Sequence, residues 1–236
     1  MVRECFNDWN RERLSDMRIE LIDEEPSGSI NLTEHDVVER LEGSLRFMRH
    51  CFDRLTFPHM KVLHQVGVNA FEVWTASDNS FGVPVNAGYV AAAYDLAADE
   101  ALTIETEIPE GVRYWSVQLG DMWSQALDYV YHQTSLNGAQ SRLSPDGKFR
   151  AVIAHQDPTF ANWLDTTGNR AGIILLRWYA SNRWHQSDHL PRPMARRVKL
   201  EHLKSESTWD SPILSVPERT VVLKERARAA LSRYGY

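Results

Sequence analysis

The middle of the chain carries one two-residue periodicity after another with no helical pattern between them, and this limits the folds open to it. Residues 102–108 alternate apolar and polar side chains, as in a half-buried strand. Residues 112–119 repeat the pattern after a Pro-Glu-Gly turn. A parallel, doubly wound sheet needs helices between its strands. The arrangement therefore predicts an antiparallel sheet.

Further strands are predicted on both sides of a tight turn. Residues 144–147 read Ser-Pro-Asp-Gly, a strong turn signal, and join predicted strands at about 138–143 and 148–155. Residues 171–179 form an apolar run of strand length, which predicts a position in the centre of a sheet. Residues 195–203 supply a last strand.

A long helix is predicted before this strand-rich block. Thr33 is a suitable N-cap, and acidic residues follow it in the first turn, where the helix dipole favours them. The helix carries an apolar stripe with steps of three and four residues. The stripe consists of Val37, Leu41, Leu45, Met48, Phe52 and Leu55. Phe57-Pro58 is predicted to end the helix.

The two ends of the chain complete the expected architecture. Ser215 and Glu218 form a capping-box pattern for a C-terminal helix that runs to about Ser232. Residues 1–6 and 17–22 alternate well enough to predict two short strands.

Strands in the middle and helices at the ends predict an α+β, β-rich fold. Its core is expected to be an antiparallel, jelly-roll-like β-sandwich, with a long helix on the N-terminal side and a C-terminal helix. We expect residues 1–87 to form an N-terminal part and residues 88–236 to form the β-sandwich domain.

Charge and composition exclude several classes of protein. The formal net charge of −6 disfavours a general affinity for nucleic acid or for an anionic membrane. No run of about 18 apolar residues predicts a membrane span, and residues 1–10 lack the features of a secretion signal. The two cysteines, Cys5 and Cys51, lie outside any metal-binding pattern, which excludes a zinc site built on thiolates. We expect neither a metal nor a cofactor. A cytoplasmic location is the simplest interpretation.

Three polar side chains are candidates for chemistry. His155 and Asp157 stand two apart and would share a face of an extended chain, as an acid–base pair or as two metal ligands. Asp165 precedes Thr-Thr-Gly, where a carboxylate organises its own loop through an Asx turn or serves as a catalytic or ligand-binding group. Asp128 with His132 would form a second pair only on a helix, and residues 128–133 read as extended.

Aromatic residues gather in the same part of the chain and admit two interpretations. They fill the core of the sandwich, or they line an amphipathic pocket for an apolar or ring-shaped ligand. The residues in question are Trp115, Trp123, Tyr129, Tyr131, Trp163 and Trp178.

An ordered series of short strings connects this part of the chain to a known family. The strings are the residues 113–119 (RYWSVQL), 127–129 (LDY), 135–137 (SLN), 145–147 (PDG), 152–158 (VIAHQDP), 162–168 (NWLDTTG) and 177–178 (RW). Over about residues 88–203 the sequence resembles the bacterial family known as domain of unknown function 1214. The resemblance implies a jelly-roll-like β-sandwich, no assigned cofactor and no established reaction.

Longer members of that family carry an additional N-terminal region, in which a strand similar to residues 2–6 closes a preceding β unit. We therefore expect this chain to correspond to the C-terminal half of a longer architecture. A first strand without its partner, together with the helix stripe, predicts a homodimer. The alternative is a monomer in which the N-terminal strand folds back onto residues 17–22 as a hairpin.

Two functional hypotheses and one structural alternative follow from these observations. The leading hypothesis is a protein that binds a small organic ligand through Trp115, Trp123, Tyr129, Trp163 and Arg177. The alternative is a metal-independent hydrolase or lyase, with His155 as the base and Asp165 or Asp157 as its orienting carboxylate. A purely structural interaction domain is the third.

Overall fold

The structure is a computed structural model that describes residues 4, 6–8, 11–20, 22, 32–53, 67–74, 86–180, 190–206 and 212–232. The chain divides into two compact units, Met1–Val62 and Leu63–Tyr236. The division predicted at residue 87 stays a prediction, although strand β1 (Phe71–Trp74) pairs with β2 (Ala87–Asp95) across it.

The first unit contains helix α1 (Glu34–Cys51), which begins as its sequence predicts. The Asp36 N–H donates to the Thr33 hydroxyl (3.2 Å), and the Thr33 N–H donates to the Asp36 carboxylate (2.8 Å). This capping box satisfies helix-end donors, and its bonds from Thr33 lower the pKa of the Asp36 carboxyl. The predicted end of the helix at Phe57-Pro58 lies outside the described residues.

The short strand predicted at residues 17–22 is wrong. Residues 17–20 and 22 have no regular structure, and the side chains of Ile19 and Ile22 are almost fully exposed. Alternation alone does not make a strand, because an extended segment needs a neighbour for its backbone hydrogen bonds. Most of the strand predicted at residues 1–6 lies outside the described part of the chain.

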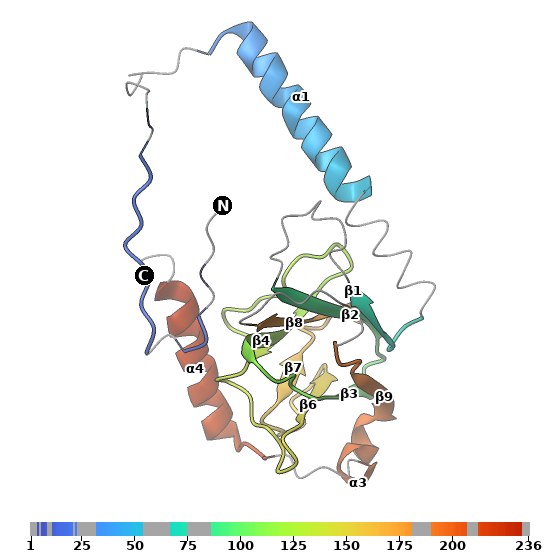
Figure 1. Cartoon of the computed structure of the whole chain (residues 1–236). Helices are drawn as coiled ribbons and strands as arrows, with labels where there is room; N and C mark the ends of the chain where they lie inside the picture. Colours follow the sequence, from blue (N-terminus) through green and yellow to red (C-terminus); the bar gives the residue numbers. More distant parts are fainter. Residues whose placement is uncertain are drawn as a thin grey trace. The chain divides into compact units, whose positions relative to one another are not determined.

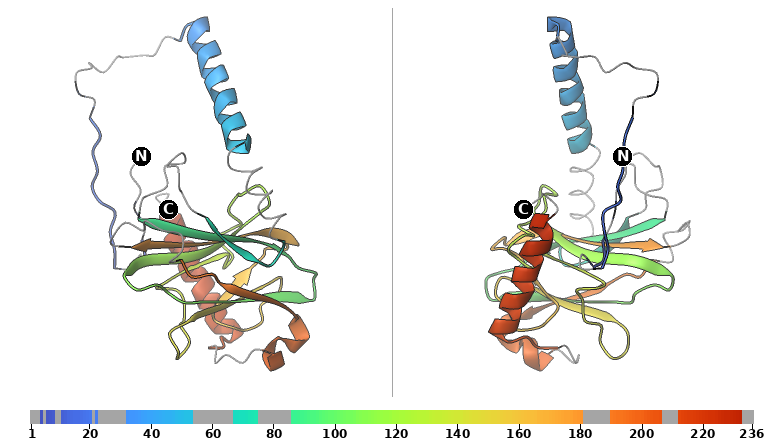
Figure 2. Two further views of the ribbon diagram at one scale, coloured as in Figure 1. Left: turned by 45° about the vertical axis from the view of Figure 1, so that its right-hand side comes forward. Right: turned by 90° about the vertical axis from the view of Figure 1, so that its left-hand side faces the viewer.

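The second unit is a β-rich sandwich of two sheets (Figures 1 and 2). The sheet orders are β1-β2-β8-β4-β5 and β7-β6-β3-β9. The remaining strands are β3 (Glu100–Thr106), β4 (Val112–Gly120), β5 (Ser135–Asn137), β6 (Phe149–Ala154), β7 (Trp163–Asp165), β8 (Ala171–Ala180) and β9 (Met194–Lys199). Neighbouring strands are antiparallel except β6 and β7, which are parallel. The jelly-roll description stays a prediction.

The core lies between the two sheets and follows from the two-residue alternation. Every second residue of β8 points inward, so Ile174, Leu176 and Trp178 are buried with residues of both sheets. Trp115 of β4 meets Phe149 of β6 edge-on, with ring centroids 4.7 Å apart. This contact joins the sheets directly, and aromatic pairs of this geometry contribute beyond the area they bury.

The strands predicted at 102–108, 112–119 and 171–179 are confirmed as β3, β4 and β8, and β8 is central. The strand predicted at 195–203 ends at Lys199 and continues as η3 (Leu200–His202) and α3 (Leu203–Glu206).

The predicted turn at 144–147 is confirmed, since the Gly147 N–H donates to the Ser144 carbonyl (2.8 Å). The hairpin around it is only partly right. Residues 138–143 form turns and one isolated bridge, Leu143 to Phe149, because the Asn137 carbonyl accepts the N–H groups of the next residues and bends the chain. Strand β6 pairs with β3 and β7 instead.

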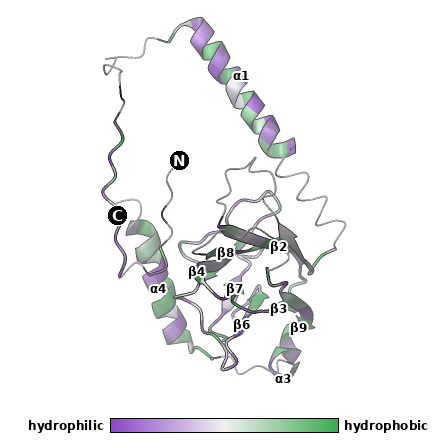
Figure 3. Ribbon diagram, viewed as in Figure 1, coloured by the Kyte–Doolittle hydropathy of each residue, from purple (hydrophilic) through white to green (hydrophobic). Residues whose placement is uncertain are grey.

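The C-terminal helix is α4 (Val216–Ser232). The Ser215 N–H and hydroxyl both donate to the Glu218 carboxylate, at 2.7 and 2.6 Å, and these bonds lower the pKa of Glu218. Hydrophilic and hydrophobic residues alternate along α4 (Figure 3), and one of its buried residues is an arginine, Arg219. Among the described residues no helix is long and apolar enough to cross a membrane.

A substitution at Gly172 tests how tightly β8 is packed. A Cβ added there would collide with the Gly120 carbonyl oxygen and come within 2.6 Å of the Tyr94 hydroxyl oxygen. We expect Gly172→Ala to lower the free energy of unfolding by about 1–3 kcal/mol, because neither neighbour can move without disturbing the core. Urea denaturation followed by tryptophan fluorescence measures the change. Gly43→Ala in α1 is the control; an equal loss in both variants would contradict the packing explanation.

Candidate functional site

Most of the predicted site residues lie at one end of the sandwich. Strands β2, β4, β6 and β7 end there and β3, β5 and β8 begin there, as the strand registers require. We call the segments 96–99, 121–134, 155–157 and 166–170 at this end the loop end. It brings together side chains from segments far apart in the sequence, as is common for binding and catalytic residues.

His155 does not pair with Asp157 or Asp165, so the predicted pairing is wrong. Its Nε2 donates to the Leu96 carbonyl (3.0 Å), and its Nδ1 accepts from the Thr166 hydroxyl (2.6 Å). Both ring nitrogens are therefore occupied by bonds that hold two loops together. Its catalytic role stays a prediction.

Asp165 organises its loop as one of the two interpretations predicts. Its Oδ1 accepts the Thr167 N–H (2.7 Å), which forms an Asx turn, and Thr167 and Gly168 both have positive φ. Its Oδ2 lies 2.8 Å from Nδ1 of His132. The structure thus contains a His–Asp pair, but its histidine is His132, which the sequence analysis considered only as a partner of Asp128 on a helix.

The reason for that error is the conformation of residues 128–133, which were predicted to be extended. The Asp128 Oδ1 accepts the N–H groups of Val130 (3.0 Å) and Tyr131 (3.1 Å). This turn brings His132 to the Asp165 carboxylate. The Asp at the start of the segment was the available signal, because Asp favours such turns.

The five predicted ligand-binding residues are not gathered in one place. Trp115 and Trp163 are buried in different core clusters, while Trp123 is 62% exposed on the β4–β5 connection. Tyr129 is half-buried, and its carbonyl accepts a bond from Arg226. Arg177 lies on the outer face of the five-stranded sheet, away from the core. Their joint role in one pocket stays a prediction.

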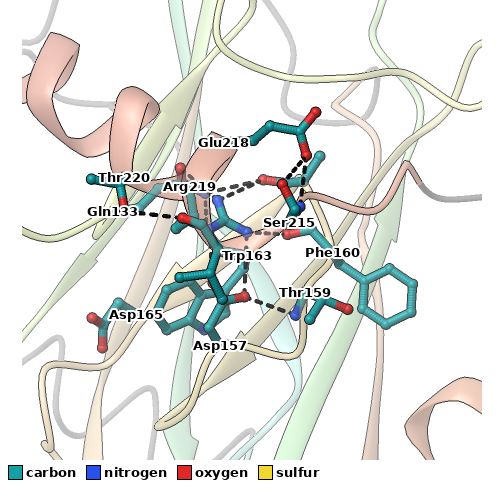
Figure 4. Close-up of polar contacts among 12 residues, drawn as sticks. Gln133, Asp157, Thr159, Phe160, Trp163, Asp165, Ser215, Glu218, Arg219 and Thr220 are labelled. Atoms are coloured by element: carbon teal, nitrogen blue, oxygen red, sulfur yellow. Dashed lines mark hydrogen bonds and ion pairs between the residues drawn. The ribbon is translucent and has the colours of Figure 1, made fainter.

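A buried arginine that the sequence analysis did not single out is the centre of the polar contacts at α4 (Figure 4). The Arg219 Nε donates to Asp157 Oδ2 (2.9 Å), and Nη1 donates to Gln133 Oε1 (3.1 Å) and to the Ala161 carbonyl (3.3 Å). Nη2 donates to the Phe160 carbonyl. The guanidinium also lies 5.3 Å from the centroid of the Trp163 ring, a cation–π geometry.

Arg226 makes a second contact of this kind, seven residues further along the same face of α4. It donates to the Tyr129 carbonyl (2.8 Å), the Ser135 carbonyl (2.9 Å) and the Ser135 hydroxyl. Burial lowers the pKa of Arg226 to about 10, and the charge of Asp128 opposes this shift. The two arginines stand where a helix stripe usually carries apolar residues, and that spacing was the sequence signal for them.

The outer face of the five-stranded sheet carries a cluster around Arg177. Arg177 Nη2 donates to Gln118 Oε1 (3.3 Å), and its Cζ lies 5.8 Å from the centroid of the Tyr89 ring. The hydroxyls of Tyr89 and Tyr179 are 3.2 Å apart, and the Tyr179 ring meets that of Tyr114 edge-on at 5.9 Å. These side chains come from β2, β8 and β4, which the strand register places side by side. We call them the Arg177 cluster.

Within the described ranges, no three His, Cys, Asp or Glu side chains converge in the way a metal ion requires. Tyr94 is fully buried near the loop end, and its hydroxyl has no hydrogen-bond partner among the described residues. Burial raises the pKa of Tyr94 well above its ordinary value, and the charges of Asp121 and Asp165 raise it further.

Comparison with known proteins confirms the resemblance. Residues 91–183, which run from β2 to just past β8, match the family described as "Protein of unknown function (DUF1214)". This part of the chain is therefore similar to the members of that family. No curated protein matches the chain.

Two solved structures are similar. An uncharacterized protein from Burkholderia cenocepacia is 34% identical with a TM-score of 0.53, over 59% of this chain and 37% of that one. A protein from Vibrio parahaemolyticus is 13% identical with a TM-score of 0.40, over 72% of this chain and 47% of that one. The chain thus spans less than half the length of either protein.

Removal of the Arg219 guanidinium tests its structural role. We expect Arg219→Met to lower the free energy of unfolding by about 3 kcal/mol, because Asp157 and three other acceptors lose their donor. Chemical denaturation measures the loss. Lys224→Met, on the exposed side of α4, is the matched control and is expected to change stability by less than about 0.5 kcal/mol. Equal stability of Arg219→Met and the native chain would contradict this role.

Proposed function

We propose that the DUF1214-like part of this chain binds a small organic anion that carries an aromatic ring, and that the Arg177 cluster is its binding surface. The single observation that carries this proposal is a half-buried arginine, framed by tyrosines, that no described carboxylate neutralises. A half-buried cation without a counter-charge favours an anionic ligand, because the ligand supplies the missing charge.

The chemistry of the cluster narrows the class of anion. A guanidinium presents paired N–H groups that match the two oxygens of a carboxylate. Arg177 Nε is buried and has no hydrogen-bond partner in the described part of the chain, and an unmet buried donor costs about 1–3 kcal/mol. A carboxylate oxygen that accepts from this guanidinium would recover part of that cost.

The tyrosines supply the second half of the recognition. Tyr89, Tyr114 and Tyr179 offer ring faces and edges for an aromatic ligand and hydroxyls for its polar substituents. The three side chains are half-buried, so little rotamer freedom is lost when a ligand binds. An aromatic carboxylate meets both requirements with one small molecule.

Titration with benzoate tests this function. We expect benzoate to shift the amide resonances of β2, β4 and β8 around Arg177 in a two-dimensional NMR spectrum, and benzamide, which lacks the charge, to shift them far less. Arg177→Met is expected to weaken benzoate binding at least tenfold, and Arg177→Lys to weaken it less. Arg170→Met is the control, because Arg170 is exposed and already paired with Asp95. No benzoate binding, or equal binding by Arg177→Met, would contradict the proposal.

A homodimer remains part of the proposal, with α1 as its contact. Val37, Leu41, Leu45 and Met48 lie on one side of α1, and their side chains are 42–65% exposed. The first half of α1 is rich in acidic residues and the second half in basic ones. An antiparallel pair of α1 helices would cover both stripes and place each acidic half against a basic half.

Light scattering after size exclusion tests the dimer. We expect twice the mass of one chain for the native protein, and a monomer for the double substitution Leu41→Glu/Leu45→Glu. Phe47→Glu is the matched control, because Phe47 is also exposed but lies on another side of α1. A native monomer, or a monomer in the Phe47→Glu control, would contradict pairing through the stripe.

A further inference from the structure

His132 and Asp165 form a pair whose geometry fixes the proton on the imidazole. Nδ1 of His132 lies 2.8 Å from Oδ2 of Asp165, and the carboxylate side chain is only 12% exposed. A carboxylate accepts but does not donate, so Nδ1 carries the proton when the imidazole is neutral. Nε2 is then the acceptor, and the side chain that carries it is 45% exposed.

The pair is held in place from both sides. The second oxygen of Asp165 accepts the Thr167 N–H, and the Asp165 N–H donates to the Gln133 carbonyl (2.9 Å). The Gln133 side chain is itself buried, donates to the Ala161 carbonyl (3.1 Å) and accepts from Arg219. Since Gln133 follows His132 directly, both members of the pair are attached to the same rigid network.

Comparison with His155 shows what distinguishes His132. Both nitrogens of His155 are bonded within the protein. Nε2 of His132 has no partner among the described residues, while its Nδ1 does. One oriented nitrogen and one accessible nitrogen is the arrangement that general base catalysis needs.

The surroundings indicate the class of substrate. Asp121 and Asp128 lie on the same β4–β5 connection as His132, and each uses one oxygen to bind backbone N–H groups. Three cations at or beside the loop end are committed to other groups, Arg170 to Asp95, Arg219 to Asp157, and Arg226 to carbonyls and a hydroxyl. This excess of negative charge disfavours anions, and exposed Trp123 and Tyr131 offer rings for apolar parts of a ligand.

We propose that His132, positioned by Asp165, is a general base that promotes hydrolysis of neutral, ring-bearing esters at the loop end. Nε2 takes a proton from a water molecule as the water oxygen bonds to the ester carbonyl carbon. The bond from that carbon to the alcohol oxygen breaks, and the proton passes from Nε2 to the departing oxygen. The products are an acid and an alcohol. This activity is separate from anion binding by the Arg177 cluster, and either can fail without the other.

Hydrolysis of 4-nitrophenyl acetate tests the proposal. We expect the native chain to exceed free imidazole at equal concentration, and His132→Gln to lower the rate at least tenfold. The rate should follow the fraction of neutral His132 measured by NMR titration of the same residue. His202→Gln is the matched control, because His202 is also exposed and lies beside a carboxylate, Glu201. A native rate no higher than that of imidazole, or an equal loss in His202→Gln, would overturn the proposal.

Asp165→Asn separates positioning from folding. The amide keeps an oxygen for the Thr167 N–H but presents an N–H group to Nδ1 of His132, so the neutral imidazole should carry its proton on Nε2 instead. We expect the ¹⁵N shifts of His132 to report this exchange of tautomers and the rate to fall at least tenfold, with the denaturation midpoint little changed. A native His132 protonated on Nε2, or an unchanged rate in Asp165→Asn, would contradict the assignment.

Discussion

The buried guanidinium of Arg219 is the interaction on which the order of the loop end depends. It binds the Asp157 carboxylate, the carbonyls of Phe160 and Ala161 and the side chain of Gln133. The backbone carbonyl of Gln133 in turn accepts a hydrogen bond from the Asp165 N–H, and the Asp165 carboxylate is hydrogen-bonded to His132. Helix α4, which belongs to neither sheet, therefore determines where the side chains of the candidate site lie.

A buried charge stabilises a protein only when its hydrogen bonds are complete, because desolvation otherwise costs more than the ion pair returns. Arg219 meets this condition with a carboxylate, an amide, two carbonyls and an aromatic face. Arg226 has carbonyl and hydroxyl partners. Burial lowers the pKa of Arg226 to about 10, because the charge of Asp128 offsets only part of the desolvation.

The parts of this structure that could be predicted from sequence are those that local rules determine. Alternation identified β3 and β4, a continuous apolar run identified β8, and cap residues identified the starts of α1 and α4. The three-residue strands β5 and β7 are too short to show a period, and they depend on partners elsewhere in the chain.

The candidate site also combines features that the local sequence determines with features that depend on distant parts of the chain. The Asx turn of Asp165 is local, and sequence reasoning allowed for it. The pairing of Asp165 with His132 spans 33 residues, and that of Arg219 with Asp157 spans 62 residues. Spacing on an extended chain favoured His155 with Asp157 instead, but His155 turns to Thr166 and Leu96, which the sheet topology brings close.

The parallel pairing of β6 and β7 has a consequence for the order in which the protein assembles. Such pairs usually need a long crossover, often a helix, yet here residues 155–162 make the return, and carbonyls of that return are satisfied by Arg219. During synthesis the return would emerge well before α4 and would wait with those carbonyls in water. The bonds from Arg219 to this return can therefore form only after α4 has docked, which makes the ordering of the loop end a late step in the folding of the domain.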